Sequence, residues 1–270
     1  MLYNQNMRNL KDILEKTKKN VKKSSKLMFD KEINISEKSD CSNLVTDKDE
    51  AVQKFLFKNL SKLIPESNFL AEETDGKIDN ESEYTWIIDP IDGTTNFIRN
   101  MKYSAISVAL KYKTDIVLGV VYAPFTKEMF WAIKDGGAYL NGKQIKTSNR
   151  LLKESIFSTS LCVYKKEFAQ ASNKVLMEIY PQISDIRRLG SCALELCYLA
   201  CGRIDLYFEM NVCPWDCAAA YVVVKEAGGL ISALQRNDID FLDNKSVIAA
   251  NNLDNYDKLI TVVDKYIKGK

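Results

Sequence analysis

The sequence predicts an α+β fold in which N-terminal helices pack on an antiparallel sheet, followed by an α/β half. Strand-rich segments between turn residues fill the middle of the chain, and strands and helices alternate from about residue 147 onward. At 270 residues, of which 46% are hydrophobic, the chain can bury one large core or two smaller ones. We therefore expect an N-terminal α+β subdomain over residues 1–146 and a C-terminal α/β subdomain over residues 147–270.

Two helical patterns open the chain, over about residues 5–29 and 48–64. The second begins behind Thr46 and Asp47, both favourable N-caps, and stops at Pro65. Segments rich in Val, Ile, Tyr, Phe and Trp then predict strands, and Asn141-Gly142 predicts a hairpin turn. These expected strands cover residues 84–88, 105–112, 116–122, 129–133, 138–140 and 143–145.

The second half alternates between short strands and helices. Gly228-Gly229 indicates a helix end. The expected strands cover residues 155–159, 185–188, 206–209, 230–232 and 246–250, and the expected helices cover 167–179, 191–201, 215–227 and 255–267.

Composition excludes several kinds of site. Histidine is absent, which rules out Ser-His and Cys-His pairs, His-ligated zinc and imidazole general bases. The seven cysteines include no C-x-x-C pair, and their odd number gives no clean disulfide framework. No stretch approaches the roughly 18 apolar residues of a membrane span, and no signal-peptide core follows Met1. We therefore expect a cytoplasmic protein without a membrane partner.

The net charge of +2 gives no general field that attracts polyanions. The one basic run, residues 16–26, also carries apolar residues near helical spacing. We favour the solvated lysine face of an amphipathic helix over a nucleic-acid or membrane patch. Nucleic acid is therefore not an expected partner.

Asp89 and Asp92 follow an apolar run, three residues apart, and Gly93, Thr94 and Thr95 come directly after them. Two carboxylates at the end of a strand can share or flank hard divalent cations, which prefer oxygen ligands. The Gly-Thr-Thr step resembles the start of a helix, where free backbone N–H groups favour phosphate. A metal ion next to a bound phosphate would indicate phosphoryl transfer. The alternative interpretation of these residues is a plain turn, because Asp-Pro and Asp-Gly are common turn dipeptides.

These residues, with two further segments, resemble the inositol monophosphatase family in order and spacing over about residues 38–251. The resemblance implies a layered αβαβα sugar-phosphatase-like fold with the active site between the two halves. The segments are Ala71–Thr74, Asp89–Phe97, and Pro214–Ala219 leading to Glu226–Gly229.

The resemblance also implies the metal ligands. Asp89 would bridge two ions, and Asp92 would complete the shell of the second ion together with Asp216. All-oxygen ligation points to Mg²⁺, as two or three ions, with Mn²⁺ as a possible substitute. The implied ligands are Glu72, Asp89, Asp92, Asp216 and the backbone carbonyl of Ile91.

The implied catalysis uses a water activated by metal. Glu72 would accept its proton, with the Thr94 hydroxyl as relay, and Asp49 would orient water around a further metal. Lys38 would lie near the site and counter its charge, and Glu73 would support Glu72. For Lys38 and Asp49, ordinary surface or capping roles remain equally open.

Separate residues would bind the phosphate group and the leaving group of the substrate. Backbone N–H groups of Gly93, Thr94 and Thr95 would bind the phosphate. Glu209 would accept a ring hydroxyl, although a solvated strand end would have the same pattern. Arg188, with Arg187, would contact an anionic substrate or a partner subunit, and we favour the subunit. The expected contacts of the leaving group are Asp92, Gly190, Ser191 and Glu209.

We therefore expect a Mg²⁺-dependent phosphomonoesterase that acts on inositol monophosphate or a similar polyol or sugar phosphate. The alternatives are fructose-1,6-bisphosphatase, histidinol-phosphatase and 3′-phosphoadenosine-5′-phosphate phosphatase, or, in another class, a non-catalytic regulatory binding protein on the same fold. The resemblance implies a homodimer and lithium sensitivity. Ala71, Cys192 and the segment 100–103 depart from the family pattern, which leaves substrate preference and loop shape open.

Overall fold

The computed structural model describes residues 2–29, 32–38, 43–74, 82–162 and 165–267. The helices are α1 (Leu2–Ser24), α2 (Asp47–Leu60), α3 (Thr94–Ile98), α4 (Ala169–Ile179), α5 (Cys192–Ala200), α6 (Pro214–Glu226) and α7 (Leu253–Tyr266). The strands are β1 (Ile35–Glu37), β2 (Leu44–Thr46), β3 (Asn68–Ala71), β4 (Tyr84–Asp92), β5 (Ala105–Tyr112), β6 (Asp115–Ala123), β7 (Glu128–Ile133), β8 (Ala138–Leu140), β9 (Lys143–Gln144), β10 (Ile156–Thr159), β11 (Asp185–Arg187), β12 (Leu206–Val212), β13 (Leu230–Ser232) and β14 (Lys245–Ala250).

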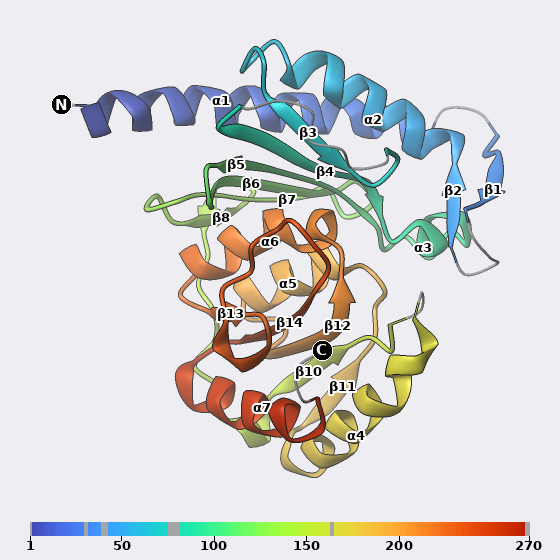
Figure 1. The fold of residues 1–270 in the computed structure, drawn as a ribbon, viewed down its shortest axis with the longest axis vertical. Helices are drawn as coiled ribbons and strands as arrows, with labels where there is room; N and C mark the ends of the chain where they lie inside the picture. The colour runs from blue at the N-terminus through green and yellow to red at the C-terminus, as the bar shows by residue number, and fades with distance from the viewer. Residues whose placement is uncertain (1, 30–31, 39–42, 75–81, 163–164, 268–270) are drawn as a thin grey trace.

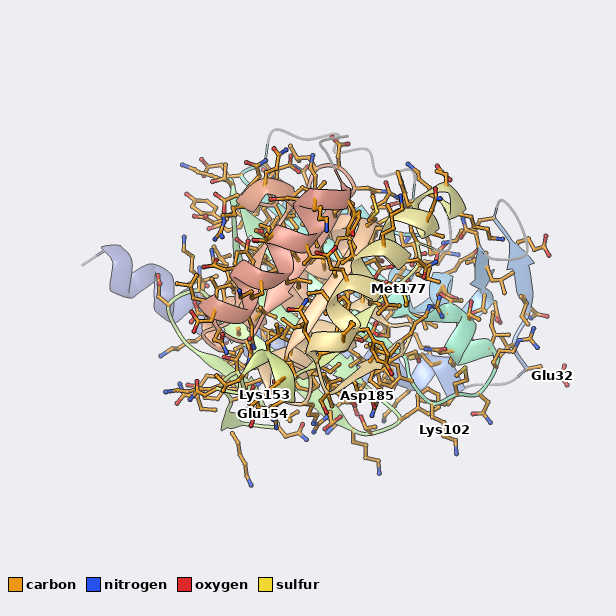
Figure 2. All side chains as sticks on the ribbon, turned by 90° about the horizontal axis from the view of Figure 1, so that it is seen from below. Glu32, Lys102, Lys153, Glu154, Met177 and Asp185 are labelled. Carbon is orange, nitrogen blue, oxygen red and sulfur yellow. The ribbon has the colours of Figure 1, made fainter. Side chains whose placement is uncertain are left out.

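The elements stack in five layers, as the predicted αβαβα fold requires (Figure 1). Helices α1 and α2 cover one face of the sheet that contains β3–β9, and α5 and α6 lie between this sheet and the sheet that contains β10–β14. Helices α4 and α7 close the other side. Viewed from that side, Met177 lies on α4 among the outer side chains, and 66% of its surface is exposed (Figure 2).

The first sheet has the strand order β3-β4-β5-β6-β7-β8-β9. Both faces are covered, so β4 reads as a continuous apolar run rather than an alternating one, and all of it after Tyr84 is buried. Helix α6 crosses the inner face closely at Gly119, where a Cβ atom would lie 2.3 Å from the Ala219 carbonyl oxygen. Glycine is therefore required at this point of β6.

One strand of this sheet corrects the prediction of an antiparallel sheet. Strand β3 was not predicted, and it pairs parallel to β4, with Ala71 opposite Ile88. Parallel neighbours end at the same edge of a sheet, so β3 and β4 deliver the residues that follow them to one place. Strand β4 also runs through Pro90 to Asp92, beyond the predicted end at residue 88.

The second sheet has the order β11-β10-β12-β14-β13 and is mixed. Strands β11 and β12 run parallel to β10, whereas β14 is antiparallel to both β12 and β13. Strand β12 does not end at Glu209 as predicted, but continues through an irregularity to Val212. Among the described residues, no helix is both long and apolar enough to cross a bilayer.

The first two helices are close to the predicted ones. Helix α1 gives way to a short 3₁₀ turn at Ser25, and it buries Ile13, Leu14 and Val21 against the sheet. Thr46 is the N-cap of α2, as predicted, and forms a capping box with Asp49. The helix ends at Leu60, before the predicted end at residue 64.

Candidate active site

Asp89 and Asp92 lie at the end of β4, where its pairing with β5 shifts register. Asp89 Oδ1 accepts a hydrogen bond from the Ile91 N–H at 2.9 Å. Both carboxylates are buried, with 1% and 6% of their surface exposed. The register shift thus turns both carboxylates away from the ladder and into one cavity, which they line.

Gly93 links β4 to α3 in a left-handed conformation, with a φ of 87°. A Cβ atom here would lie 3.0 Å from the Gly190 carbonyl oxygen, so the site requires glycine for both its dihedral and its close contact. Thr94 is the first residue of α3, and its hydroxyl donates to the Ile91 carbonyl at 3.0 Å. The predicted helix start after Gly93 is therefore present.

Asp216 enters the same cavity from the first turn of α6. Its carboxylate accepts a hydrogen bond from the Cys213 N–H at 3.1 Å, which fixes the side chain at the helix start. Carboxylate oxygens of Asp89, Asp92 and Asp216 all lie within 4.8 Å of one another. The structure thus brings together three acids from two distant segments.

Glu72 lines the same cavity, and the parallel pairing of β3 with β4 brings it there. It follows β3, and its N–H donates to the Ile88 carbonyl at 3.3 Å, next to Asp89. Lys38 Nζ lies 3.0 Å from Glu72 Oε1 and 2.8 Å from Glu73 Oε1. Although burial lowers it, these two carboxylates raise the pKa of Lys38 above its ordinary value. Of the two roles left open for Lys38, the structure places it at the acids.

Asp49 combines a capping bond with a free oxygen. Its Oδ2 accepts from the Thr46 N–H at 2.8 Å and from the Thr46 hydroxyl at 2.5 Å. Its Oδ1 is buried and has no hydrogen-bond partner within the described part of the chain. Burial raises the pKa of Asp49 to about 7. A buried acceptor without a partner fits a bound water or cation.

Burial and mutual repulsion raise the pKa values of the carboxylates in this cavity. Burial, and then the carboxylate of Glu72, raise the pKa of Asp89 and of Asp216 well above the ordinary value. Burial also raises the pKa of Asp92 to about 7. Acids placed this close cannot all ionise without positive charge among them. The donor set is entirely oxygen, so it fits a hard divalent cation of the Mg²⁺ type.

Comparison with known proteins agrees with this geometry. The sequence profile described as "Inositol monophosphatase family" matches residues 6–268. The chain belongs to this family. Like other inositol monophosphatase family members it is a phosphomonoesterase, and the layered αβαβα fold is confirmed.

Particular relatives of this phosphatase show the extent of the similarity. It is 37% identical to inositol monophosphatase 3 of Solanum lycopersicum over 77% of this chain and 80% of that one. It is 35% identical to the Nus factor SuhB of Salmonella typhimurium strain LT2, over 71% and 72% of the two chains. The crystal structure of the extragenic suppressor protein suhB from Bartonella henselae superposes with a TM-score of 0.84 at 31% identity. It covers 95% of this chain and 98% of that one.

The C-terminal half of this phosphatase closes the cavity, whose volume is about 370 Å³. Ser191, the N-cap of α5, donates from its hydroxyl to Asp92 Oδ2 at 2.5 Å, and the Ala193 N–H donates to the same oxygen at 2.8 Å. The Ser191 hydroxyl, expected to face the substrate, therefore holds a carboxylate in this structure. Arg188 and Gly190 line the cavity beside it.

Glu209 also lines the cavity, from within β12. Its carboxylate accepts a hydrogen bond from the Tyr207 hydroxyl at 2.5 Å. Burial raises the pKa of Glu209 above its ordinary value. Glu209 lies inside β12 and faces the cavity, so it is not the solvated strand end that was the alternative.

Four residues that line this cavity had no predicted role in the site: Asn96, Ser160, Cys192 and Glu195. The Asn96 amide donates to the carbonyls of Tyr103 and Leu189, at 2.9 and 2.7 Å, and so ties α3 to the loop before α5. Glu195 is buried, and its Oε1 accepts from the Ser158 hydroxyl at 2.6 Å. Burial raises its pKa to about 7. An acid inside the apolar run of α5 was the one available signal for Glu195.

Proposed function

We propose that this chain is a Mg²⁺-dependent phosphatase that hydrolyses inositol monophosphate or a similar polyol or sugar phosphate. The observation that carries the proposal is the set of carboxylate oxygens of Asp89, Asp92 and Asp216 within 4.8 Å of one another, in a cavity that also contains the Gly93–Thr95 turn. Such a cluster supports a cation site directly beside a phosphate site.

The residues that would hold the cations are Glu72, Asp89, Asp92, Asp216 and the Ile91 carbonyl. The donors fit Mg²⁺, with Mn²⁺ as a substitute, and the free Oδ1 of Asp49 gives a place for a further ion or its water. When bound, such ions supply Lewis acidity that acidifies water and neutralises phosphate oxygens. We propose two or three ions.

The chain's own groups would orient and accept protons. Glu72 would take the proton of the attacking water, because it lines the same cavity as the three clustered aspartates and also contacts solvent-accessible Lys38. Thr94 would relay this proton through its hydroxyl, which already donates to Ile91. Backbone N–H groups of Gly93, Thr94 and Thr95 would bind the phosphate oxygens.

The lining of the cavity favours a polyol as the leaving group. Apart from the acids, it consists of hydroxyls, an amide, one arginine, a thiol and backbone, and none of its lining residues within the described chain is aromatic. A nucleotide base would be expected to stack on an aromatic side chain, whereas ring hydroxyls need hydrogen-bond acceptors. Asp92, Gly190, Ser191 and Glu209 would contact these hydroxyls, and Arg188, which lines the same cavity, would contact an anionic substrate or a partner subunit.

We further propose that residues 1–146 and 147–270 are two subdomains with the active site between them. The first carries most of the cation ligands, and the second carries Asp216 and the contacts of the leaving group. We also propose a cytoplasmic homodimer that is inhibited by lithium. Free thiols at the six described cysteines support a reducing compartment. Light scattering tests the dimer, and Li⁺ in the activity assay tests inhibition.

A second function has its own support. Relatives at 35% identity are named Nus factor SuhB, so a regulatory binding role is the alternative from another class. The two roles differ in the residues that they require. Catalysis requires the clustered carboxylates of Asp89, Asp92 and Asp216, all of which this chain has, whereas a binding role does not.

The experiment measures phosphate release at saturating Mg²⁺ from a panel of substrates. The panel contains inositol 1-phosphate, fructose 1,6-bisphosphate, histidinol phosphate and 3′-phosphoadenosine 5′-phosphate. We expect inositol 1-phosphate, or another monophosphate with several ring hydroxyls, to give the highest kcat/KM. A higher value for the nucleotide would contradict the polyol assignment, and no release from any of the four by folded protein would favour the binding role.

A further inference from the structure

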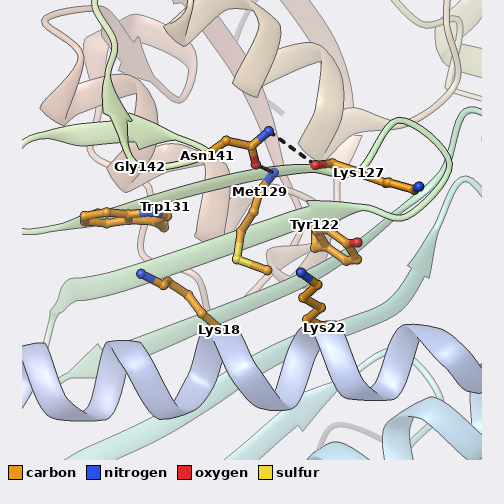
Figure 3. Close-up of a pocket in the computed structure, with 8 residues that line it drawn as sticks. All are labelled: Lys18, Lys22, Tyr122, Lys127, Met129, Trp131, Asn141 and Gly142. Atoms are coloured by element: carbon orange, nitrogen blue, oxygen red, sulfur yellow. Dashed lines mark hydrogen bonds between the residues drawn. The ribbon is translucent and has the colours of Figure 1, made fainter.

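A second cavity, of about 500 Å³, lies on the outer face of the first sheet, away from the carboxylate cluster. Helix α1 forms one wall, and strands β6 and β7 with the turn between β8 and β9 form the rest (Figure 3). The cavity exists because α1 crosses the sheet over β6 and leaves Met129 and Trp131 of β7 only partly covered. Its volume is in the range of small-molecule sites.

The floor of this cavity is aromatic and apolar. Tyr122 on β6 and Met129 on β7 are direct cross-strand neighbours, and Trp131 follows two residues along β7. Tyr122 is buried, whereas Met129 and Trp131 are half-buried. Trp131 stacks on Tyr139 with ring centroids 4.1 Å apart, which fixes the indole in place. Such a floor fits a flat apolar group, and the methionine can adapt to its outline.

The charge of this cavity is entirely positive. Lys18, Lys22 and Lys127 line it, and none of its lining residues in the described part of the chain carries a carboxylate. Lys18 Nζ lies 4.5 Å from the Trp131 ring centroid, and its ion-pair partner Glu15 is outside the lining. Neither Lys22 nor Lys127 pairs with a carboxylate of the described residues. Figure 3 shows the side chains of Lys18 and Lys22 rising from α1 toward the floor.

The rim is already formed. Asn141 Oδ1 accepts a hydrogen bond from the Met129 N–H at 2.9 Å, and the Asn141 N–H donates to the Met129 carbonyl at the same distance. The Asn141 amide also donates to the Lys127 carbonyl at 3.3 Å. Three hydrogen bonds thus hold the β8–β9 turn against the start of β7, so the rim of the cavity is in place before a ligand binds.

We propose that this cavity binds a small aromatic acid, that is, one flat ring system carrying a sulfonate, carboxylate or phosphate group. The ring would lie on Tyr122 and Met129, and the acid group would lie between Lys18 and Lys22. The carboxylate cavity recognises hydroxyls and cations, whereas this one has ammonium groups over an apolar floor, so the two select different chemistry. This inference does not depend on the proposed function.

The test uses the fluorescent probe 8-anilinonaphthalene-1-sulfonate with the full chain. We expect one saturable site, and binding about tenfold weaker for uncharged N-phenyl-1-naphthylamine, which lacks the ion pairs. Lys18→Gln with Lys22→Gln should weaken binding about tenfold. The matched control, Lys19→Gln with Lys23→Gln, removes the same charge from α1. These two lysines line a neighbouring groove, which Lys22 also borders, and not the proposed cavity. This control should change affinity by less than about twofold.

Further variants separate the outcomes. Met129→Glu places a carboxylate on the floor and should abolish binding, while equal thermal midpoints show that the variants fold. Equal weakening by both lysine pairs, or by neither, would overturn the proposal. Displacement of the probe by Mg²⁺ together with inorganic phosphate, but not by inorganic phosphate alone, would assign it to the carboxylate cavity and also overturn the proposal.

Discussion

The Ser191 hydroxyl donates a hydrogen bond to Asp92 Oδ2 over 2.5 Å, and this bond joins the two halves of the molecule at the carboxylate cluster. Asp92 ends β4 of the first sheet, whereas Ser191 caps α5 in the layer between the sheets. The orientation of one proposed cation ligand therefore depends on how the two halves meet.

Replacing Ser191 by alanine tests this dependence. The Ala193 N–H still holds the same oxygen, so we expect Asp92 to remain in the cluster but to lose its fixed orientation. Mg²⁺ affinity and kcat/KM should fall by about 10- to 100-fold, as for other groups that orient a ligand. Titration calorimetry with Mg²⁺ measures the first quantity. Ser172→Ala is the matched control, because that buried hydroxyl on α4 has no partner among the described residues and its loss should leave affinity unchanged.

Gly93→Ala should remove activity and destabilise the fold. The new Cβ would lie 3.0 Å from the Gly190 carbonyl oxygen, and φ is 87°. Gly228→Ala shares the dihedral problem, with a φ of 88°, but has no atom within 4 Å of its Cβ. Both variants should lose about 1 kcal/mol of unfolding free energy for the left-handed backbone. Gly93→Ala should lose additional unfolding free energy because its Cβ meets the Gly190 carbonyl oxygen. Equal losses of unfolding free energy for the two variants in urea would refute this steric contact.

Lys38→Gln should strengthen Mg²⁺ binding while it destabilises the metal-free protein. The ammonium lies 3.0 Å from Glu72 Oε1, where it neutralises the acids and repels an incoming cation. The Coulomb energy at such distances predicts an affinity about three- to tenfold higher. Lys54→Gln, which breaks an exposed ion pair with Glu50, is the control and should change neither quantity. Weaker Mg²⁺ binding in Lys38→Gln would mean that Lys38 holds Glu72 in its binding position.

Glu195→Gln should change how stability depends on pH. Burial raises the pKa of Glu195 to about 7 in the folded state, so the folded protein keeps a proton that the unfolded chain releases at lower pH. The wild type should therefore lose stability as pH rises from about 4.5 to 7, by up to about 3 kcal/mol from this group. The amide oxygen of the variant can accept the same hydrogen bonds from Ser158 and Leu189, but the amide has no proton to release. The free energy of unfolding of the variant should therefore fall less than that of the wild type over this pH range. Urea unfolding at both ends of this range measures the difference, and parallel pH profiles would contradict it.

The fold was predictable where local patterns are strong. The apolar run before Asp89 and the N-cap at Thr46 both mark elements that the structure contains. Strand β3 escaped prediction because only four residues belong to it and its reason to be a strand is the neighbouring β4. That parallel pairing brings Glu72 into the cavity that Asp89 lines, a contact that the sequence motif does not reveal.

The site was predictable where residues lie in a motif and less so where tertiary contacts define it. The structure brings together Glu72, Asp89, Asp92 and Asp216 in one cavity. Glu195 was missed because an acid in an apolar helix gives no local sign of its partners. The Ser191 hydroxyl contacts Asp92, which lies 99 residues away in the sequence. No local sequence pattern could predict this contact.

The most direct measurement is phosphate release from inositol 1-phosphate by metal-stripped protein as Mg²⁺ is titrated. Asp92→Asn is measured in parallel. We predict no release without Mg²⁺, saturable release with it, and loss of this response in the variant, whose metal-free form should be more stable because one buried charge is gone. Release that does not depend on Mg²⁺, or that survives in Asp92→Asn, would contradict the account of the carboxylate cluster as a cation site for phosphate hydrolysis.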